Sequence, residues 1–363
     1  MLPLIILFNV AHHQRVERAP MRTVEYTRRG DPAQVLTLRE KPHRPTPGSG
    51  EVLVRVLVSP VHPGDLIGVE GPPGPPEQQE EARTPGVEGM GVVESVGADV
   101  RAQRPGQRVA VFPAPGTWSD FVVVPAELAV PVPDGVSDET AALMLVNPLT
   151  LRMLYRAMED ALRGRPGPVL QTAAGSSIGR LVSATAARHD VRLINLVRSA
   201  SGAERLRALH PSQPAVATCD DDWRAQVGLH AGERGARVVL DSVGGAMTRD
   251  LAELLADDGT LVSYGQLGSG TTPLEALPLI GRALTVRGVT VLRWTSLTPQ
   301  ERAQDVAFAQ ELARSRPDLL EVAGSYDLAD FKAAIEHARR PAKSGTVLLT
   351  TARTTGSGQE GAR

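Results

Sequence analysis

A run of small residues near the middle of the chain has a spacing that could bind a phosphate group. Ala173, Ser176 and Gly179 stand at the spaced positions of the segment 168–180, which opens with an apolar stretch that predicts a buried strand. Small side chains let the backbone approach a dinucleotide diphosphate, and the N–H groups that begin the next helix bind the anion. An ordinary turn is the alternative, because the run is not a complete G-x-G-x-x-G. The expected cofactor-binding residues here are Ala173, Ser176, Ser177, Ile178 and Gly179.

A second apolar stretch, 192–198, ends in an arginine that bears on the choice of cofactor. An acidic side chain at this place holds the ribose 2′-hydroxyl of NAD(H), whereas an arginine favours the additional 2′-phosphate of NADP(H). Arg198 therefore predicts NADPH as the cofactor. A solvated loop arginine is the alternative.

Further strand patterns place these residues in one parallel sheet. The segments 236–245 and 259–265 predict strands that end in glycine turns, with a helix at 247–256 between them. Alternating strands and helices are typical of a doubly wound α/β sheet, the Rossmann arrangement. The residues expected to reach the cofactor from these strand ends are Val243, Tyr264 and Gly265.

The rest of the chain has a different pattern, with short strands separated by proline and glycine turns. From residue 21 to about 132 this spacing predicts a β-rich, barrel-like domain with a mobile loop at 71–81. A final strand at 345–350 most simply rejoins its sheet. The expected organisation is a disordered extension (1–20), a barrel-like domain (21–145 and 295–351), a nucleotide-binding domain (146–294) and a disordered tail (352–363).

Three helices and one more strand are expected around the nucleotide-binding strands. Helices are predicted at 137–145 and, after an interruption at 146–150, at 151–162. Another is predicted at 299–315, and the last nucleotide-domain strand is expected to run from 284 to 292.

Composition limits the classes of function and the compartment. A formal net charge of -2 on 363 residues argues against a nucleic-acid partner. The single cysteine, Cys219, excludes an internal disulfide and fits a reducing compartment, so we expect a cytoplasmic location. Residues 1–10 are apolar but too few to span a bilayer, and they lack the features of a signal peptide. They are either an extension or the product of an upstream start codon, with Met21 as the true start.

An ordered series of motifs resembles the medium-chain dehydrogenase/reductase superfamily over nearly all of 21–350. Residues 85–93 (PGVEGMGVV) are similar to its P-G-x-E-x-x-G-x-V segment, and 116–121 and 146–150 also match. Within it the chain most resembles the zinc-independent mitochondrial-type 2-enoyl thioester reductases and their NADPH:quinone reductase relatives. The segments that carry this second likeness are 171–179 (QTAAGSSIG), 194–198 (INLVR) and 284–288 (LTVRG), with Trp294 beyond.

This resemblance implies a GroES-like barrel domain beside a Rossmann domain, a small-molecule substrate, and NADPH whose phosphate is held by Arg198. It also implies a homodimer in which the edge segment 284–292 of each nucleotide-binding domain meets its copy. That segment is nearly free of the charges that protect exposed edges. A monomer with a covered edge is the alternative.

The same comparison argues against a metal. Zinc enzymes of this superfamily place a cysteine in C-x-x-D and a histidine in G-H-E, where this chain has His62 and Val87. A catalytic zinc needs three protein ligands at defined positions, so no metal is expected. Glu88 is expected to fix a buried turn.

One departure from the pattern of the enoyl thioester reductases concerns the substrate. Enoyl thioester reductases carry a tyrosine, in a G-x-Y stretch, that is thought to donate a proton or orient the thioester carbonyl. The matching stretch here is Gly71-Pro72-Pro73, so Pro73 replaces the tyrosine. This weakens the case for an acyl thioester but leaves hydride chemistry intact, because the reduced nicotinamide supplies the hydride.

The reaction that these residues would serve is conjugate reduction of a C=C activated by a carbonyl. His62 is the candidate acid, since related enzymes place Cys or Asn there facing the nicotinamide; a loop histidine beside a proline is the alternative. Asn147 and Thr150 are expected on the nicotinamide side. Trp118 and Trp294 are expected to wall the substrate pocket, and a core position is an equal alternative for Trp118.

Three functions stay open. The first is an NADPH-dependent enone or enoyl reductase, and the second is an NADPH:quinone reductase. The third is an NADPH-binding regulatory protein with little catalysis. Turnover of a panel of enones and quinones separates the first two, and tight binding without turnover favours the third.

Overall fold

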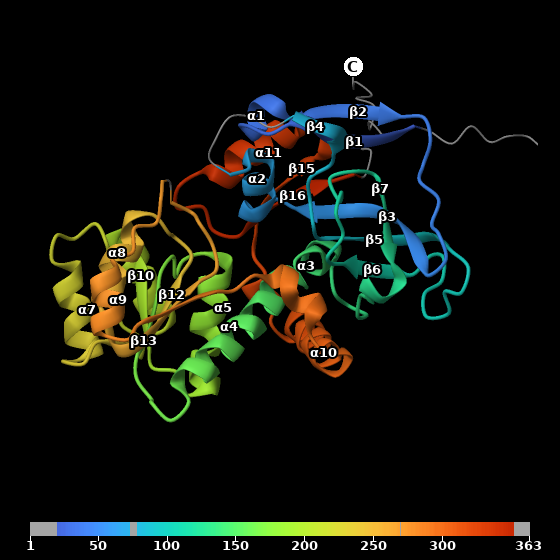
Figure 1. Ribbon diagram of the computed structural model, residues 1–363. Helices are drawn as coiled ribbons and strands as arrows, with labels where there is room; N and C mark the ends of the chain where they lie inside the picture. The colour runs from blue at the N-terminus through green and yellow to red at the C-terminus, as the bar shows by residue number, and fades with distance from the viewer. Residues whose placement is uncertain (1–19, 73–77, 269, 352–363) are drawn as a thin grey trace, which may run out of the picture.

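The computed structural model describes residues 20–72, 78–268 and 270–351, which form two sheet-based parts (Figure 1). The first part has the strands β1 (Met21–Arg28), β2 (Thr37–Lys41), β3 (Glu51–Pro60), β4 (Gln78–Arg83), β5 (Gly89–Val96), β6 (Arg108–Val111), β7 (Phe121–Pro125), β8 (Ala129–Pro131), β15 (Val322–Asp327) and β16 (Thr346–Thr350). Its helices are α1 (Pro32–Val35), α2 (Pro63–Glu70), α3 (Asp138–Ala142) and α11 (Phe331–Arg339).

Both ends of the chain contribute to the first part. A seven-stranded sheet runs β15-β16-β3-β5-β6-β8, with β7 also paired to β3, and a three-stranded sheet runs β2-β1-β4. β16 pairs antiparallel with β3, with Leu348 opposite Pro60. The predicted return of the last strand to the first sheet is therefore confirmed.

The second part is a parallel sheet flanked by helices. Its strands are β9 (Val169–Gln171), β10 (Leu193–Val197), β11 (Ala215–Ala217), β12 (Ala236–Asp241), β13 (Leu255–Ser263) and β14 (Thr285–Gly288). Its helices are α4 (Val146–Leu162), α5 (Ser177–Thr185), α6 (Ala200–Leu209), α7 (Trp223–Ala231), α8 (Ala246–Glu253) and α9 (Ala276–Gly281), and α10 (Pro299–Ser315) packs on α4. The order β11-β10-β9-β12-β13-β14 is that of a doubly wound sheet, as predicted.

Apolar strand residues point alternately to two cores. Val169 and Val238 lie on the α4 and α5 face, whereas their neighbours Leu170 and Val239 pack on the opposite face, with residues of α7 and α8. Because both faces are covered, the strands are apolar almost throughout. The first of these cores also contains Phe112 from the first part, so one continuous core joins the two parts.

α4 begins five residues earlier than predicted. Val146 is its first residue, so the expected interruption at 146–150 is wrong. Pro148 falls in the first helical turn, where its missing N–H has no intrahelical acceptor to lose. The predicted helix at 299–315 matches α10 at both ends.

Two predicted segments around the sheets also differ. β14 ends at Gly288, opposite Ser263, and a 3₁₀ helix at Val291–Ser296 follows, so the predicted strand 284–292 is too long. Within the predicted loop 71–81, the residues from Gln78 onward belong to β4, which pairs with β1. Residues 73–77, which include Pro73, lie outside the described residues.

In the described part of the chain, no helix is long and apolar enough to cross a membrane.

Candidate active site

The nucleotide-binding edge lies where β9 and β12 end side by side. The strand order runs outward from β9 in one direction and from β12 in the other, and dinucleotides bind at such a switch point. The Thr172 hydroxyl joins the two strand ends by donating to Asp241 Oδ1 at 3.1 Å and accepting from the Ser242 N–H at 3.0 Å.

The turn after β9 is tight enough to require glycine at its far end. Ala173 has a φ of 47°, and the Ser176 hydroxyl caps α5 by accepting from the Gly179 N–H at 3.1 Å. A Cβ on Gly179 would lie 2.6 Å from both the Ala173 oxygen and the Ala174 Cα. The first N–H groups of α5 have no helical acceptor, so this close helix start suits a diphosphate.

The first residues of α5 also touch the rest of the molecule. The Ser177 hydroxyl lies 3.2 Å from the Thr346 hydroxyl at the start of β16, and Ile178 packs against the shared core. The nucleotide-binding turn therefore lies against the first part of the molecule.

A buried amide network behind the turn was not foreseen in the sequence. The Gln171 amide nitrogen lies 2.6 Å from Asn195 Oδ1, 2.9 Å from the Ser183 hydroxyl and 3.1 Å from the Gly179 carbonyl oxygen. It holds β9, β10 and α5 together. The signal was Asn195, a polar residue in the middle of an otherwise apolar strand.

Arg198 is exposed directly after β10. The next residue, Ser199, caps α6 by accepting from the Gly202 N–H at 3.2 Å. Among the described residues, no hydrogen bond or ion pair engages the Arg198 guanidinium, so it is available to a ligand.

The ends of β12 and β13 carry the other expected cofactor residues. Asp241 orders the turn at Val243 by accepting its N–H at 2.9 Å, and a Cβ on Gly265 would lie 3.2 Å from Ser242. Burial raises the pKa of Tyr264 to about 12. The buried Tyr264 and Ser242 hydroxyls face each other, and this contact partly offsets the effect of burial on the pKa of Tyr264. These hydroxyls lie at the switch point, where a dinucleotide binds.

His62 and Glu88 form a buried pair next to the start of α4. His62 Nε2 lies 2.7 Å from Glu88 Oε2, and the Glu88 side chain is fully buried. Glu88 Oε1 accepts the N–H groups of Leu145 and Val146, each at 2.8 Å. Glu88 therefore fixes more than its own turn, because it links His62 to the N-terminus of a helix.

Two further charged groups act on His62. Burial alone lowers the pKa of His62, but the hydrogen bond to the Glu88 carboxylate and the charges of Glu88 and Asp65 outweigh burial and the charge of Lys343. The net shift of the pKa is therefore upward. Burial raises the pKa of Asp65 to about 6, although its Oδ2 accepts the His62 N–H at 2.9 Å. The pKa of His62 therefore lies above the ordinary value for histidine.

Asn147 and Thr150 follow on the first turn of α4. Both are buried, and the Thr150 hydroxyl donates to the Val146 carbonyl at 2.6 Å. Asn147 therefore lies within two residues of Leu145 and Val146, whose N–H groups donate to Glu88.

The two tryptophans lie in the core. Trp118 is fully buried and donates its Nε1–H to the Pro60 carbonyl at 3.2 Å, which agrees with the core position that the sequence left open. Trp294 is also buried, with its ring centroid 6.3 Å from that of Phe112. Its Nε1–H has no partner in the described part of the chain, which leaves it a donor that a ligand could use.

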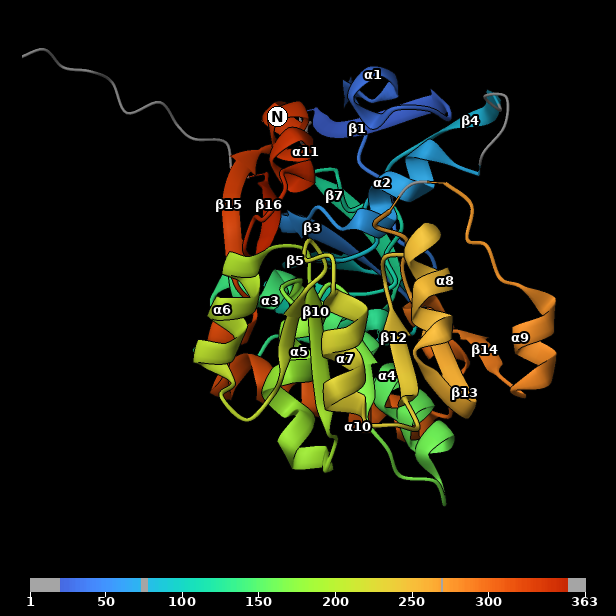
Figure 2. The same ribbon diagram turned by 90° about the vertical axis from the view of Figure 1, so that its left-hand side faces the viewer.

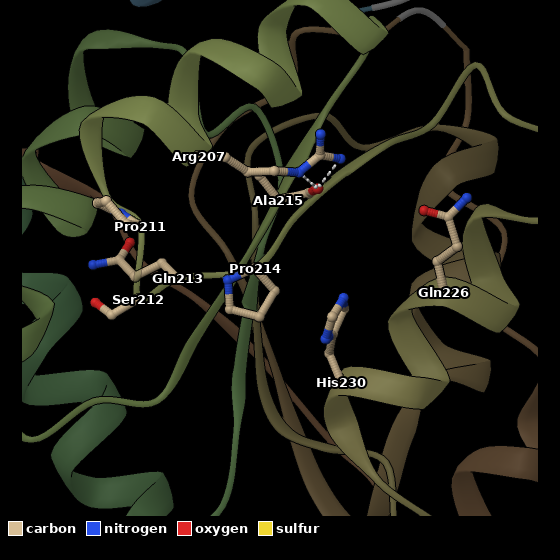
Figure 3. Close-up of a pocket in the computed structure, with 8 residues that line it drawn as sticks. All are labelled: Arg207, Pro211, Ser212, Gln213, Pro214, Ala215, Gln226 and His230. Atoms are coloured by element: carbon tan, nitrogen blue, oxygen red, sulfur yellow. Dashed lines mark hydrogen bonds between the residues drawn. The ribbon is translucent and has the colours of Figure 1, made fainter.

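A surface hollow lies away from the nucleotide-binding edge. It has a volume of about 400 Å³ and is lined by residues of α6, α7 and the segment before β11, among them Arg207, Pro214 and His230 (Figure 3). These lie at the start of β11, the opposite end of the sheet from Arg198. The Arg207 guanidinium is occupied by the Ala215 carbonyl, at 2.8 Å from Nη2.

Comparison with known proteins assigns the family. The model of the alcohol dehydrogenase GroES-like domain matches residues 48–134, and that of the zinc-binding dehydrogenases matches residues 177–311. The mitochondrial enoyl-acyl-carrier-protein reductase of Homo sapiens is 29% identical over 340 residues, covering 92% of this chain and 90% of the relative. The chain belongs to the medium-chain dehydrogenase/reductase superfamily.

Solved structures of this superfamily share the fold. A protein described as an NADPH:quinone reductase from Bacillus thuringiensis is 28% identical, with a TM-score of 0.80 over 92% of this chain and 100% of its own. A mycobacterial protein complexed with NADPH is also 28% identical, with a TM-score of 0.78 over 91% of this chain and 99% of its own. The first part of this chain is thus the GroES-like domain, and the parallel sheet is the Rossmann-like domain.

The expectation that the chain binds no zinc stays a prediction. Across the described residues, no three His, Cys, Asp or Glu side chains are grouped so that they could hold a metal ion. Val87 offers no ligand, and His62 is bound to Glu88. We predict that treatment with a chelator leaves NADPH oxidation unchanged and that elemental analysis finds less than one zinc per chain. Activity that is lost on chelation and restored by zinc would contradict this.

Proposed function

We propose that this chain is a zinc-independent, NADPH-dependent oxidoreductase that reduces a C=C activated by a carbonyl, in an enone or an enoyl thioester. The observation that carries the proposal is the buried His62–Glu88 pair beside the first turn of α4. It supplies a proton donor to a Rossmann-like domain that has Arg198 exposed at its nucleotide-binding edge. The human relative is named an enoyl reductase, and the mycobacterial neighbour is a complex with NADPH.

The chain's own residues would bind and orient the cofactor. The start of α5 binds the diphosphate, with Ser176 and Gly179 shaping it, and Arg198 binds the 2′-phosphate. Asn147 and Thr150 approach the nicotinamide side. When bound, the reduced nicotinamide supplies a hydride for the β-carbon of the acceptor.

His62 then completes the reduction. Negative charge spreads over the α-carbon and the carbonyl oxygen of the acceptor, and a hydrogen-bond donor at that oxygen stabilises it. The N–H bond of the His62 imidazolium breaks, and its proton forms the new C–H bond at the α-carbon. The acceptor thus gains one hydride and one proton, and His62 is left neutral beside Glu88.

The test is NADPH oxidation by the purified protein with enones, enoyl thioesters and quinones. We expect turnover with enones or enoyl thioesters and a product saturated at the former C=C. NADPH bound tightly with no turnover of any acceptor would favour the regulatory protein instead.

A quinone is the second candidate acceptor. It is favoured by the Bacillus thuringiensis neighbour, which is named an NADPH:quinone reductase. Turnover confined to quinones in the same panel would establish this alternative.

We also propose a cytoplasmic location, on the single cysteine alone. A tagged protein found in a membrane-bound compartment would exclude this location.

We propose that two copies pair through the outer edge of the Rossmann-like domain. Figure 2 shows β14 and α9 together at that edge. Leu277 and Ile280 on α9 are 82% and 75% exposed, and Val286 on the edge strand β14 is 44% exposed. Large exposed apolar side chains beside an open strand edge favour an interface there.

The double variant Ile280→Lys, Val286→Lys should split this dimer, because it places two charges in the apolar surface. Light scattering at micromolar concentration should give a monomer that still binds NADPH. Val289 and Val291 are unsuitable for this test, since they pack against the core. Leu229→Lys, at an 83% exposed leucine on α7, is the control and should remain dimeric. A monomer for the unmodified protein would exclude the pairing.

A further inference from the structure

Glu88 makes more contacts than a turn requires. Its two oxygens accept from His62 and from the N–H groups of Leu145 and Val146, at 2.7 to 2.8 Å, and none of its surface is exposed. A buried carboxylate is costly unless charge and hydrogen bonds compensate it. Here the compensation comes from the positive end of α4 and from the hydrogen bond with the His62 imidazole.

The same carboxylate joins three segments that are far apart in the sequence. His62 precedes α2, Glu88 precedes β5, and Val146 begins α4, one residue before Asn147. Moving Glu88 would therefore shift the candidate donor and the nicotinamide-facing turn together.

We propose that Glu88 is a positioning residue that keeps the proton on His62 and holds it in register with the first turn of α4. The proposal rests on the donor role of His62 in the proposed function. It goes further by assigning the protonation state of the donor to one named carboxylate.

The charges around His62 agree with this assignment. The groups that face it are Glu88, Asp65 from α2, and Lys343 from the segment before β16. The positive charge of Lys343 lowers the pKa of His62. The Lys343 ammonium donates to the Gly345 carbonyl at 2.8 Å, and burial lowers the pKa of Lys343 itself. Glu88 is the one group of the three that bonds the imidazole ring.

Glu88→Gln separates this role from a merely structural one. The glutamine carbonyl can still accept the Leu145 and Val146 N–H groups, so α4 keeps its contact. Its amide nitrogen is a donor only, and it would face His62 Nε2, which must then give up its proton to accept. The matched control is Glu94→Gln on β5, where the carboxylate pairs with Arg44 at 2.9 Å instead.

The measurement is an NMR titration of the His62 imidazole in the full-length protein without substrate, assigned by the missing signal in His62→Gln. We expect the midpoint in Glu88→Gln to lie about 1–3 pH units below that of the unmodified protein, and Glu94→Gln to match the unmodified protein. An unchanged midpoint in a folded Glu88→Gln would overturn the proposal. Because no substrate is used, this result is independent of whether any acceptor is turned over.

Two further readouts extend the test. With an active acceptor, the alkaline limb of kcat should move to lower pH in Glu88→Gln while KM for NADPH stays the same; a change in KM alone would indicate a structural role and overturn the proposal. If Glu88→Gln does not fold, Glu88→Asp is the second variant, because it keeps the carboxylate charge. Shortening the side chain lengthens its contact with the imidazole, so the His62 titration midpoint should lie below that of the unmodified protein, and an unchanged midpoint in a folded Glu88→Asp would overturn the proposal.

Discussion

Replacing Arg198 with alanine should raise the Michaelis constant for NADPH roughly tenfold to a hundredfold and leave that for NADH almost unchanged. A hydrogen bond to a charged group contributes about 1.5–3 kcal/mol, and each 1.4 kcal/mol is a factor of about ten. The 2′-phosphate is the only group that distinguishes the two cofactors. The side chain is exposed at the end of β10, so its removal should not disturb the fold.

Arg192→Ala is the matched control for this experiment. Arg192 is also exposed, but it precedes β10, at the end of the strand away from the switch point. Steady-state kinetics with both cofactors should show no change for this variant. Equal use of NADPH and NADH by the unmodified protein would show that Arg198 does not select the cofactor.

Gly179→Ala should both weaken NADPH binding and destabilise the protein. Its Cβ would meet the backbone of Ala173 and Ala174 at 2.6 Å, and backbone atoms cannot turn away as a flexible side chain can. α5 would have to move off the turn, which breaks the Ser176 cap and misplaces the N–H groups meant for the diphosphate. Overpacking of this kind costs about 1–3 kcal/mol.

Thermal unfolding and NADPH titration by fluorescence measure the two effects. Gly228→Ala on α7 is the control, because a Cβ there meets nothing within 4 Å. Alanine is the better helix former, so this variant should be as stable as the unmodified protein or more so. A Gly179→Ala protein with unchanged melting temperature and NADPH affinity would contradict the account of the turn.

Local patterns were enough to predict much of the fold. α10 matches its prediction because Thr298 and Glu301 form a capping box and Pro299 opens the helix. The parallel sheet follows from alternating strands and helices. Local patterns could not predict where α4 begins. The first N–H groups of the helix have no helical acceptor, and the oxygen that accepts from Val146 belongs to Glu88, 58 residues earlier in the chain.

The site was predicted less completely than the fold. The small-residue turn and Arg198 are local features, so the local sequence pattern was enough to predict them. The contact between His62 and Glu88 spans 26 residues and depends on how α2 and β5 pack, which no local pattern encodes. Trp118 occupies the core, one of the two positions that the sequence left open, because an aromatic residue near a predicted pocket gives no sign of which face it occupies.

The proposal of conjugate reduction is tested most directly by following where the hydride goes. NADPH carrying deuterium at the transferred position should be incubated with an enone that the protein turns over, and the product analysed by NMR. We predict one deuterium at the β-carbon and one solvent-derived hydrogen at the α-carbon. Deuterium at the carbonyl carbon, or in neither position of a reduced product, would contradict the proposed function.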